Sequence, residues 1–289
     1  MVIVNGEVMA RDQKALFKNE DPIPPFTRET VHLDHAFFDA KTYHIYPKSS
    51  NMPSAYVQAV EMYDGYFKRA FHARLSIDPA NGCLVPNTEL DVLKVVVIDR
   101  HHGKKSHGTA FVRGFKLKQG AIACTTNCEN QNLVIVGTSD ANIAFAAQAI
   151  HEIGGGYVAV AHGQVLGAVA LAVAGCMSEK PWEEVAKESI ELDRIVHQQL
   201  VGKDEIPMKV PFMILSFVGL VGVPDLGLTE RGLIVTSEQK LMNVVLDEKA
   251  VVDEQTVNTG AQMTRICCRC PSHGHGIHRL IDEQTAGYG

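Results

Sequence analysis

The sequence predicts an α/β or α+β layered domain, a mixed sheet with packed helices, preceded by an incomplete small β segment. Apolar runs rich in β-branched residues recur at 92–98, 121–125 and 133–137, as in central strands. A segment with helical spacing, a strand pair and a further helix follow. These elements occupy residues 71–246, too few for the eight repeating units and roughly 250 residues of a typical barrel.

The first 70 residues precede this domain. Residues 1–18 predict two short strands around a turn at Asn5-Gly6, a dipeptide that tolerates the positive φ of a tight hairpin. Because a lone hairpin is marginally stable, we expect these to be remnant strands of a composite β-domain. Residues 19–70, rich in proline and polar residues in their first part, predict a connector with irregular structure.

The helices follow from local signals. Ser139 and its neighbours offer capping side chains before a helix that ends at a triple glycine starting at Gly154. A hairpin is expected at 157–161 and 165–171. A second helix should run from Ser178 to about Leu200, and a third should lie near Met213.

Composition excludes several classes of partner. The formal charge of -6 comes from interspersed acids and bases, so no electrostatic footprint for nucleic acid is present. The longest apolar run, 210–223, contains a proline and glycines and is shorter than the roughly 20 residues that span a bilayer. Seven cysteines, an odd number, follow a start without a signal-peptide pattern. We therefore expect a cytoplasmic protein that binds no membrane.

Residues 90–233 resemble the C-terminal domain of adenine deaminases, in the amidohydrolase superfamily. The similar stretches keep their order and spacing, which makes chance resemblance improbable. They are LDVLKVVVIDRHHG, GTAFVRGFKLKQGAIA, NLVIVGTSD, EIGGGYVAV, GQVLGAVALAVAGCMS, PFMILSFVGL and PDLGLTERGL.

The resemblance implies a function that depends on a second, barrel-shaped domain. In the complete family a barrel that precedes this domain holds the divalent metal, manganese or iron, and the enzyme converts adenine and water to hypoxanthine and ammonia. Nothing in the 289 residues fits that N-terminal metal-binding barrel. We expect the C-terminal part of such a hydrolase, inactive alone, whose partner is a barrel domain or subunit, with self-association left open.

One loop departs from the family. Typical members have Ala-His-Asp-Ser-His-Asn where this chain has Asn127-Cys-Glu-Asn-Gln-Asn. Cys128 and Gln131 take the histidine positions, Glu129 takes the aspartate position, and Asn132 is unchanged. Glu129, Cys128 and Asn132 are therefore candidates for a residual catalytic or substrate-contacting role. The alternative is a hydrogen-bonded turn built by asparagine side chains.

A second loop follows the strand at 92–98. It contains Arg100, His101 and His102, and residues at the exit of a central strand are well placed to reach a ligand. These three are candidates for a substrate loop. Simple solvation of an exposed basic loop is the alternative.

The tail, residues 247–289, contains a Cys/His cluster. Thiols and imidazoles suit zinc, and Cys268, Cys270, His273 and His275 are the candidate ligands. The alternative is an unstructured terminus, because structural zinc sites usually draw ligands from two separated knuckles. If the tail binds metal, the chain could instead be a stand-alone metal-binding or accessory module without catalytic activity.

Overall fold

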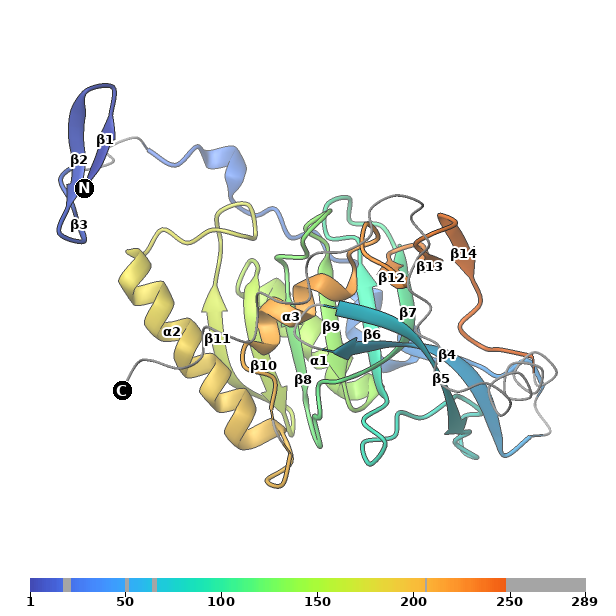
Figure 1. The fold of residues 1–289 in the computed structure, drawn as a ribbon. Helices are drawn as coiled ribbons and strands as arrows, with labels where there is room; N and C mark the ends of the chain where they lie inside the picture. The colour runs from blue at the N-terminus through green and yellow to red at the C-terminus, as the bar shows by residue number, and fades with distance from the viewer. Residues whose placement is uncertain (18–21, 50–51, 64–66, 206, 248–289) are drawn as a thin grey trace, which may run out of the picture. The chain divides into compact units, whose positions relative to one another are not determined.

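The computed structural model describes residues 1–17, 22–49, 52–63, 67–205 and 207–247. Within these ranges an eight-stranded mixed sheet has the order β11-β10-β8-β9-β6-β7-β4-β5 (Figure 1). Its strands are β4 (Ser54–Tyr63), β5 (Phe67–Ser76), β6 (Leu93–Ile98), β7 (His107–Arg113), β8 (Ala121–Cys124), β9 (Leu133–Gly137), β10 (Gly156–Ala161) and β11 (Gln164–Ala170). Of the strand pairs described, β4 with β7 is parallel and the others are antiparallel.

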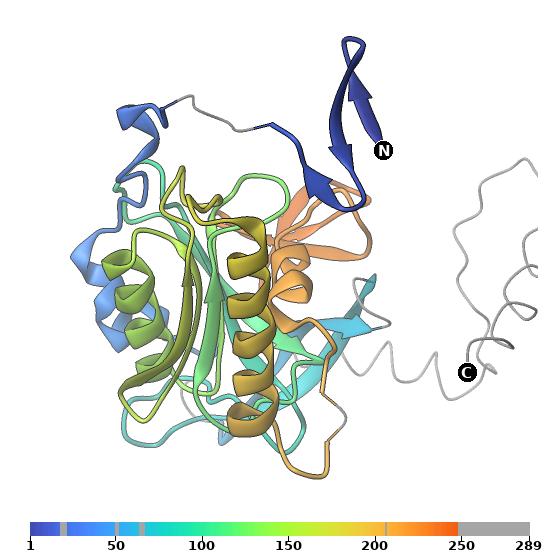
Figure 2. The same ribbon diagram turned by 90° about the vertical axis from the view of Figure 1, so that its left-hand side faces the viewer.

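Helices cover both faces of this sheet (Figure 2). One face carries α1 (Asp140–Glu152) and the short 3-10 turns η2 (His35–Phe38) and η3 (Ala40–Tyr43). The other carries α2 (Trp182–Ile195), α3 (Pro211–Val218) and a small antiparallel sheet. That sheet contains β12 (Leu226–Thr229), β13 (Gly232–Val235) and β14 (Lys240–Met242). The predicted fold class, a mixed sheet with packed helices, is confirmed.

Strand β6 shows why the central runs are continuously apolar. Successive side chains point to opposite faces of a sheet, and both faces of β6 are covered. Leu93, Val95 and Val97 pack on the side of α2 and α3, whereas Val96 and Ile98 pack on the side of α1. All five are fully buried.

The helix ends follow the local sequence. The Ser139 side chain caps α1 by accepting a hydrogen bond from the Asn142 amide at 3.2 Å. Gly154, with φ +74°, follows the helix in the left-handed region. Helix α2 starts after Pro181, and a π turn (Val196–Leu200) extends it to the residue where the sequence predicted its end.

The connector expected over 19–70 is only partly irregular. The ten residues of β4 and the first residues of β5 belong to the large sheet instead. Earlier in the connector, Phe37 and Tyr43 are fully buried against α1. The prediction of irregular structure was wrong over β4, because this strand buries side chains on both faces, which hides its strand period. The domain boundaries themselves stay predictions.

The predicted strand pair at the N-terminus is present as β1 (Val2–Val4) and β2 (Glu7–Arg11), with a short third strand, β3 (Lys14–Ala15). Asn5 and Gly6 have positive φ at the turn between the first two, as predicted. Among the helices described, none is long and apolar enough to cross a membrane.

Candidate functional site

Two loops that carry predicted site residues meet at one end of the large sheet. Strand β6 ends at Ile98, which pairs with Leu133 at the start of the antiparallel β9. Strand β8 ends at Cys124, opposite Val134 of β9. Residues 99–102 and 125–132 therefore leave the sheet at the same end, and we call them the loop end.

Arg100 is enclosed at the loop end. It is 1% exposed, and its guanidinium donates to three carbonyl oxygens: Gln131 at 2.5 Å, Thr30 at 3.2 Å and Ala174 at 3.0 Å. Burial lowers the pKa of this guanidinium, but arginine keeps its proton in proteins. Each nitrogen of the planar guanidinium thus donates to the backbone of a different segment. This geometry favours a role for Arg100 in positioning these three segments. Substrate contact by Arg100 stays a prediction.

His101 and His102 are exposed beside it. His101 Nε2 donates to the Asn130 carbonyl oxygen at 2.8 Å, since a carbonyl can only accept. His102 Nδ1 lies 2.7 Å from an Asp99 carboxylate oxygen. Burial opposes ionisation of Asp99, but hydrogen bonds from the His101 amide and from His102 hold its pKa below the ordinary value. The structure brings both imidazoles to the loop end without testing whether they contact substrate.

Cys128 joins the loop end to α3, and Glu129 joins it to the segment after α3. The Cys128 amide donates to the Ser216 carbonyl at 3.1 Å, and its sulfur lies 3.3 Å from the Ser216 hydroxyl. The Glu129 carboxylate accepts from the amides of Val221 at 2.9 Å and Gly222 at 3.0 Å. Glu129 therefore acts here as a cap for a turn.

Three amide side chains in this loop have unsatisfied oxygens. Asn127 is fully buried and Asn132 is 4% exposed. The side-chain oxygens of Asn127, Gln131 and Asn132 are buried and accept no hydrogen bond from the described residues. The Asn132 amide nitrogen is used, because it donates to the Glu230 carboxylate at 3.1 Å. Such acceptors require a water or a ligand donor to offset their desolvation.

Asn127, Glu230 and Ser216 were not predicted as site residues. Glu230 lies in the turn between β12 and β13, and its partner Asn132 is 98 residues away along the chain. Nothing in the local sequence marks that pairing. The asparagine-rich run starting at Asn127 was the available signal for the first of them.

A metal-like cluster lies at the opposite end of β6. Ligand atoms of His44, Cys83 and Asp140 lie within 4.8 Å of one another. However, the buried ammonium of Lys94 already contacts Asp140, and it also donates to the Tyr43 carbonyl at 3.0 Å. Burial raises the pKa of the Cys83 thiol, which disfavours the thiolate that a metal needs. These residues do not fit a centre that activates water.

This cluster could not be predicted from the sequence, because its members come from three segments that are far apart in the chain. The predicted zinc ligands Cys268, Cys270, His273 and His275 lie outside the described residues.

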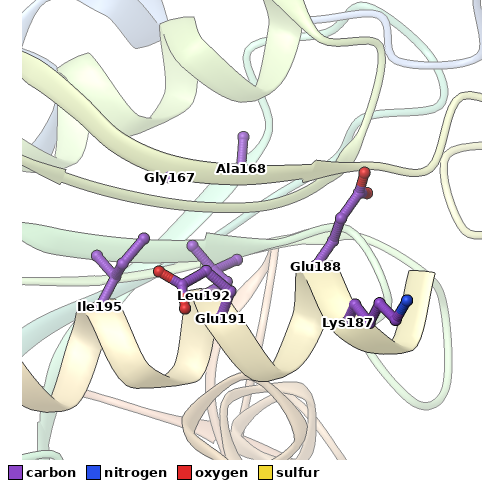
Figure 3. A pocket seen from close by; sticks show the side chains of 7 residues that line it. All are labelled: Gly167, Ala168, Lys187, Glu188, Glu191, Leu192 and Ile195. Carbon is purple, nitrogen blue, oxygen red and sulfur yellow. The ribbon is translucent and has the colours of Figure 1, made fainter. Parts of the chain in front are cut away.

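Pockets lie elsewhere on the domain. A groove of about 310 Å³ runs between β11 and α2, where Gly167 has no side chain and Leu192 and Ile195 form part of its wall (Figure 3). A Cβ at Gly167 would come within 2.8 Å of Leu192. A larger pocket of about 590 Å³ lies at the C-terminal end of α1 beside His32 and His151. None of the predicted site residues that the structure describes lines either pocket.

Comparison with known proteins places the chain in a family. Residues 70–240 match the model of the adenine deaminase C-terminal domain. Adenine deaminase of Dehalococcoides mccartyi (strain CBDB1) is 36% identical over 242 residues, which cover 84% of this chain and 40% of that protein. Adenine deaminase of Desulforamulus reducens is 36% identical over 247 residues, 85% of this chain and 40% of that protein.

A third relative agrees. Adenine deaminase of Clostridium botulinum (strain ATCC 19397 / Type A) is 41% identical over 158 residues, which cover 55% of this chain and 26% of that protein. The chain thus spans about 40% of the length of the first two relatives. It belongs to the adenine deaminase C-terminal domain family.

Proposed function

We propose that the chain serves as the C-terminal part of an adenine deaminase-like hydrolase, whose complete reaction converts adenine and water to hypoxanthine and ammonia. The observation that carries this proposal is the family match over residues 70–240, together with relatives named adenine deaminase. Purine metabolism in the cytoplasm is the setting that such an activity implies.

The catalytic centre in this proposal comes from a partner. Hydrolytic deamination needs a hydroxide nucleophile near neutral pH and a group that moves protons to the leaving ammonia. Among the described residues, the single cluster of metal-ligand type is His44, Cys83 and Asp140, and it is already paired with Lys94. An amidohydrolase barrel, as a domain or a subunit, would supply the manganese or iron and the water that the metal activates.

The loop end is the part of this chain that we assign to the shared site. Its unsatisfied oxygens on Gln131 and Asn132 can accept hydrogen bonds from an amino group of a purine. His101 and His102 are exposed beside them. The Cys128 and Gln131 substitutions remove two imidazoles from the loop, so this chain would position substrate there without moving protons through those positions.

Reconstitution tests the proposal. Ammonia release from adenine would be measured for this chain alone, for the barrel portion of the Dehalococcoides mccartyi relative alone, and for their mixture, each loaded with manganese or iron. We expect no release above the buffer blank from this chain and a rate in the mixture above that of the barrel alone. Replacing Asn132 by Leu should reduce that gain, whereas Asn81→Leu, in a distant turn, should preserve it.

Two results would contradict the proposal. Ammonia release by this chain alone would show that it contains a complete active site. A mixture no faster than the barrel portion would remove the proposed partnership. In the second case the accessory-module alternative gains weight, provided that the tail ligands Cys268, Cys270, His273 and His275 bind zinc.

A further inference from the structure

Another pocket lies between α2 and α3, above the ends of β8 and β10. Its volume is about 240 Å³. Thr126 and Tyr157 contribute from the sheet, Asp193 from α2, and Phe212 and Ser216 from α3. Figures 1 and 2 show both helices on the same face of the sheet. Thr126 belongs to the loop end and Ser216 contacts Cys128 there, but Gln131, Asn132, His101 and His102 do not line this pocket.

Asp193 is the unusual group in this pocket. Burial raises its pKa, while His197 acts in the opposite direction. Among the described residues, its carboxylate accepts no hydrogen bond and has no ion pair. Two other acids of the same helix differ: Glu188 pairs with Lys180, and Glu191 pairs with Arg194. A half-buried carboxylate that has no hydrogen bond or ion pair among the described residues, in a pocket, is a candidate binding group.

The walls around Asp193 are aromatic and hydroxylic. The rings of Tyr157 and Phe212 lie 5.2 Å apart with an interplanar angle of 34°. The Thr126 hydroxyl donates to the Tyr157 hydroxyl at 3.3 Å. The Ser216 hydroxyl donates to the Met213 carbonyl at 2.6 Å, which leaves its oxygen as an acceptor. Aromatic faces and oxygen acceptors both attract cations.

We propose that this pocket binds a small organic cation, an amine or amidine carried on a compact flat body, with its N–H groups on the Asp193 carboxylate. The volume is below the range of about 300–1,000 Å³ that holds drug-sized ligands, so a ligand of one ring fits best. The charge of the ligand neutralises the unpaired carboxylate, and its ring packs against Phe212 and Tyr157. This site requires no deaminase activity and goes beyond the function proposed above.

Three ligands of nearly the same shape test the charge requirement. Benzamidine carries the amidinium, benzamide is its neutral counterpart, and benzoate is an anion. Titration calorimetry on the whole chain should show that benzamidine binds most tightly and benzoate least. Hydrogen bonds to a charged group contribute about 1.5–3 kcal/mol, so Asp193→Asn should weaken benzamidine binding about ten- to a hundredfold. Glu191→Gln, on the same helix but outside the pocket, should change it less than about twofold.

Backbone amide shifts locate the bound ligand. Benzamidine should shift the amides of Thr126, Ser189 and Ser216, and Asp193→Asn should remove those shifts while the rest of the spectrum shows a folded protein. The proposal is overturned if benzamidine binds no tighter than benzamide, if Asp193→Asn binds it as well as the parent, or if none of the three ligands binds.

Discussion

Lys94→Met tests whether a buried charge pair joins α1 to the central sheet. Lys94 is the one charged residue in the apolar run of β6, and it is fully buried. Its ammonium contacts the carboxylate of Asp140 in the first turn of α1, whose side chain is 14% exposed. The second Asp140 oxygen lies 3.7 Å from His44 Nε2.

The expected loss of stability depends on which member of the ion pair remains. Removing one member of a buried ion pair costs about 3–5 kcal/mol, because the other charge is left unpaired. In Lys94→Met, Asp140 keeps His44, some solvent and the favourable N-terminus of α1, so we expect a loss of about 3 kcal/mol. In Asp140→Asn, the enclosed ammonium keeps one charge-free carbonyl partner, and we expect a loss of about 5 kcal/mol. The double variant should lose less than Asp140→Asn alone.

Urea unfolding followed by far-UV circular dichroism measures the stability of the parent, the two single variants and the double variant. Lys240→Met is a matched control, since that lysine side chain is 74% exposed, and it should change stability by less than about 0.5 kcal/mol. If the losses of the two single variants add within about 0.5 kcal/mol in the double variant, the two charges do not interact and this reasoning fails.

Three further predictions concern other segments. Burial lowers the pKa of Lys68 from 10.5 to about 8, so between these pH values the unfolded chain binds more protons than the folded chain. The stability of the parent relative to Lys68→Met should therefore rise by about 3 kcal/mol from pH 8 to pH 10.5. A stability difference that does not change with pH in urea unfolding would contradict this prediction. Amides of the exposed strand β1 should exchange much faster than those of β6, as measured by mass spectrometry; equal protection would mean that another surface covers β1. The tail should bind one zinc per chain through thiolates and imidazoles, and metal analysis should find none in the Cys268→Ser, Cys270→Ser double variant; a variant that keeps zinc would exclude that site.

The sequence predicted elements that local patterns determine. The β-branched run in β6 marks a strand covered on both faces, and Ser139 marks the start of α1. Strand β4 was missed because its apolar residues face both the α3 side, at Val60, and a separate cluster that contains Val57. No period of two survives in such a strand.

The site residues depend on contacts between segments far apart in the chain. Glu129 was predicted as a candidate for its carboxylate, but its two amide donors lie 92 and 93 residues away. The loop itself therefore contains no sign that this carboxylate caps a turn. The local sequence likewise does not mark Asp193, because only the three-dimensional arrangement of its neighbours shows that its carboxylate has no hydrogen bond or ion pair among the described residues.

Arg100 shows most directly how the structure changes the interpretation of a predicted site residue. Its three carbonyl partners belong to three segments, at Thr30, Gln131 and Ala174. A lysine ammonium cannot reproduce the planar fork, so Arg100→Lys should lose most of these bonds and about 3 kcal/mol of stability in urea unfolding. Arg231→Lys, at an exposed arginine, should lose less than about 0.5 kcal/mol. If Arg100→Lys instead keeps full stability but removes the rate gain in the reconstituted mixture, then Arg100 contacts substrate, and its positioning role is refuted.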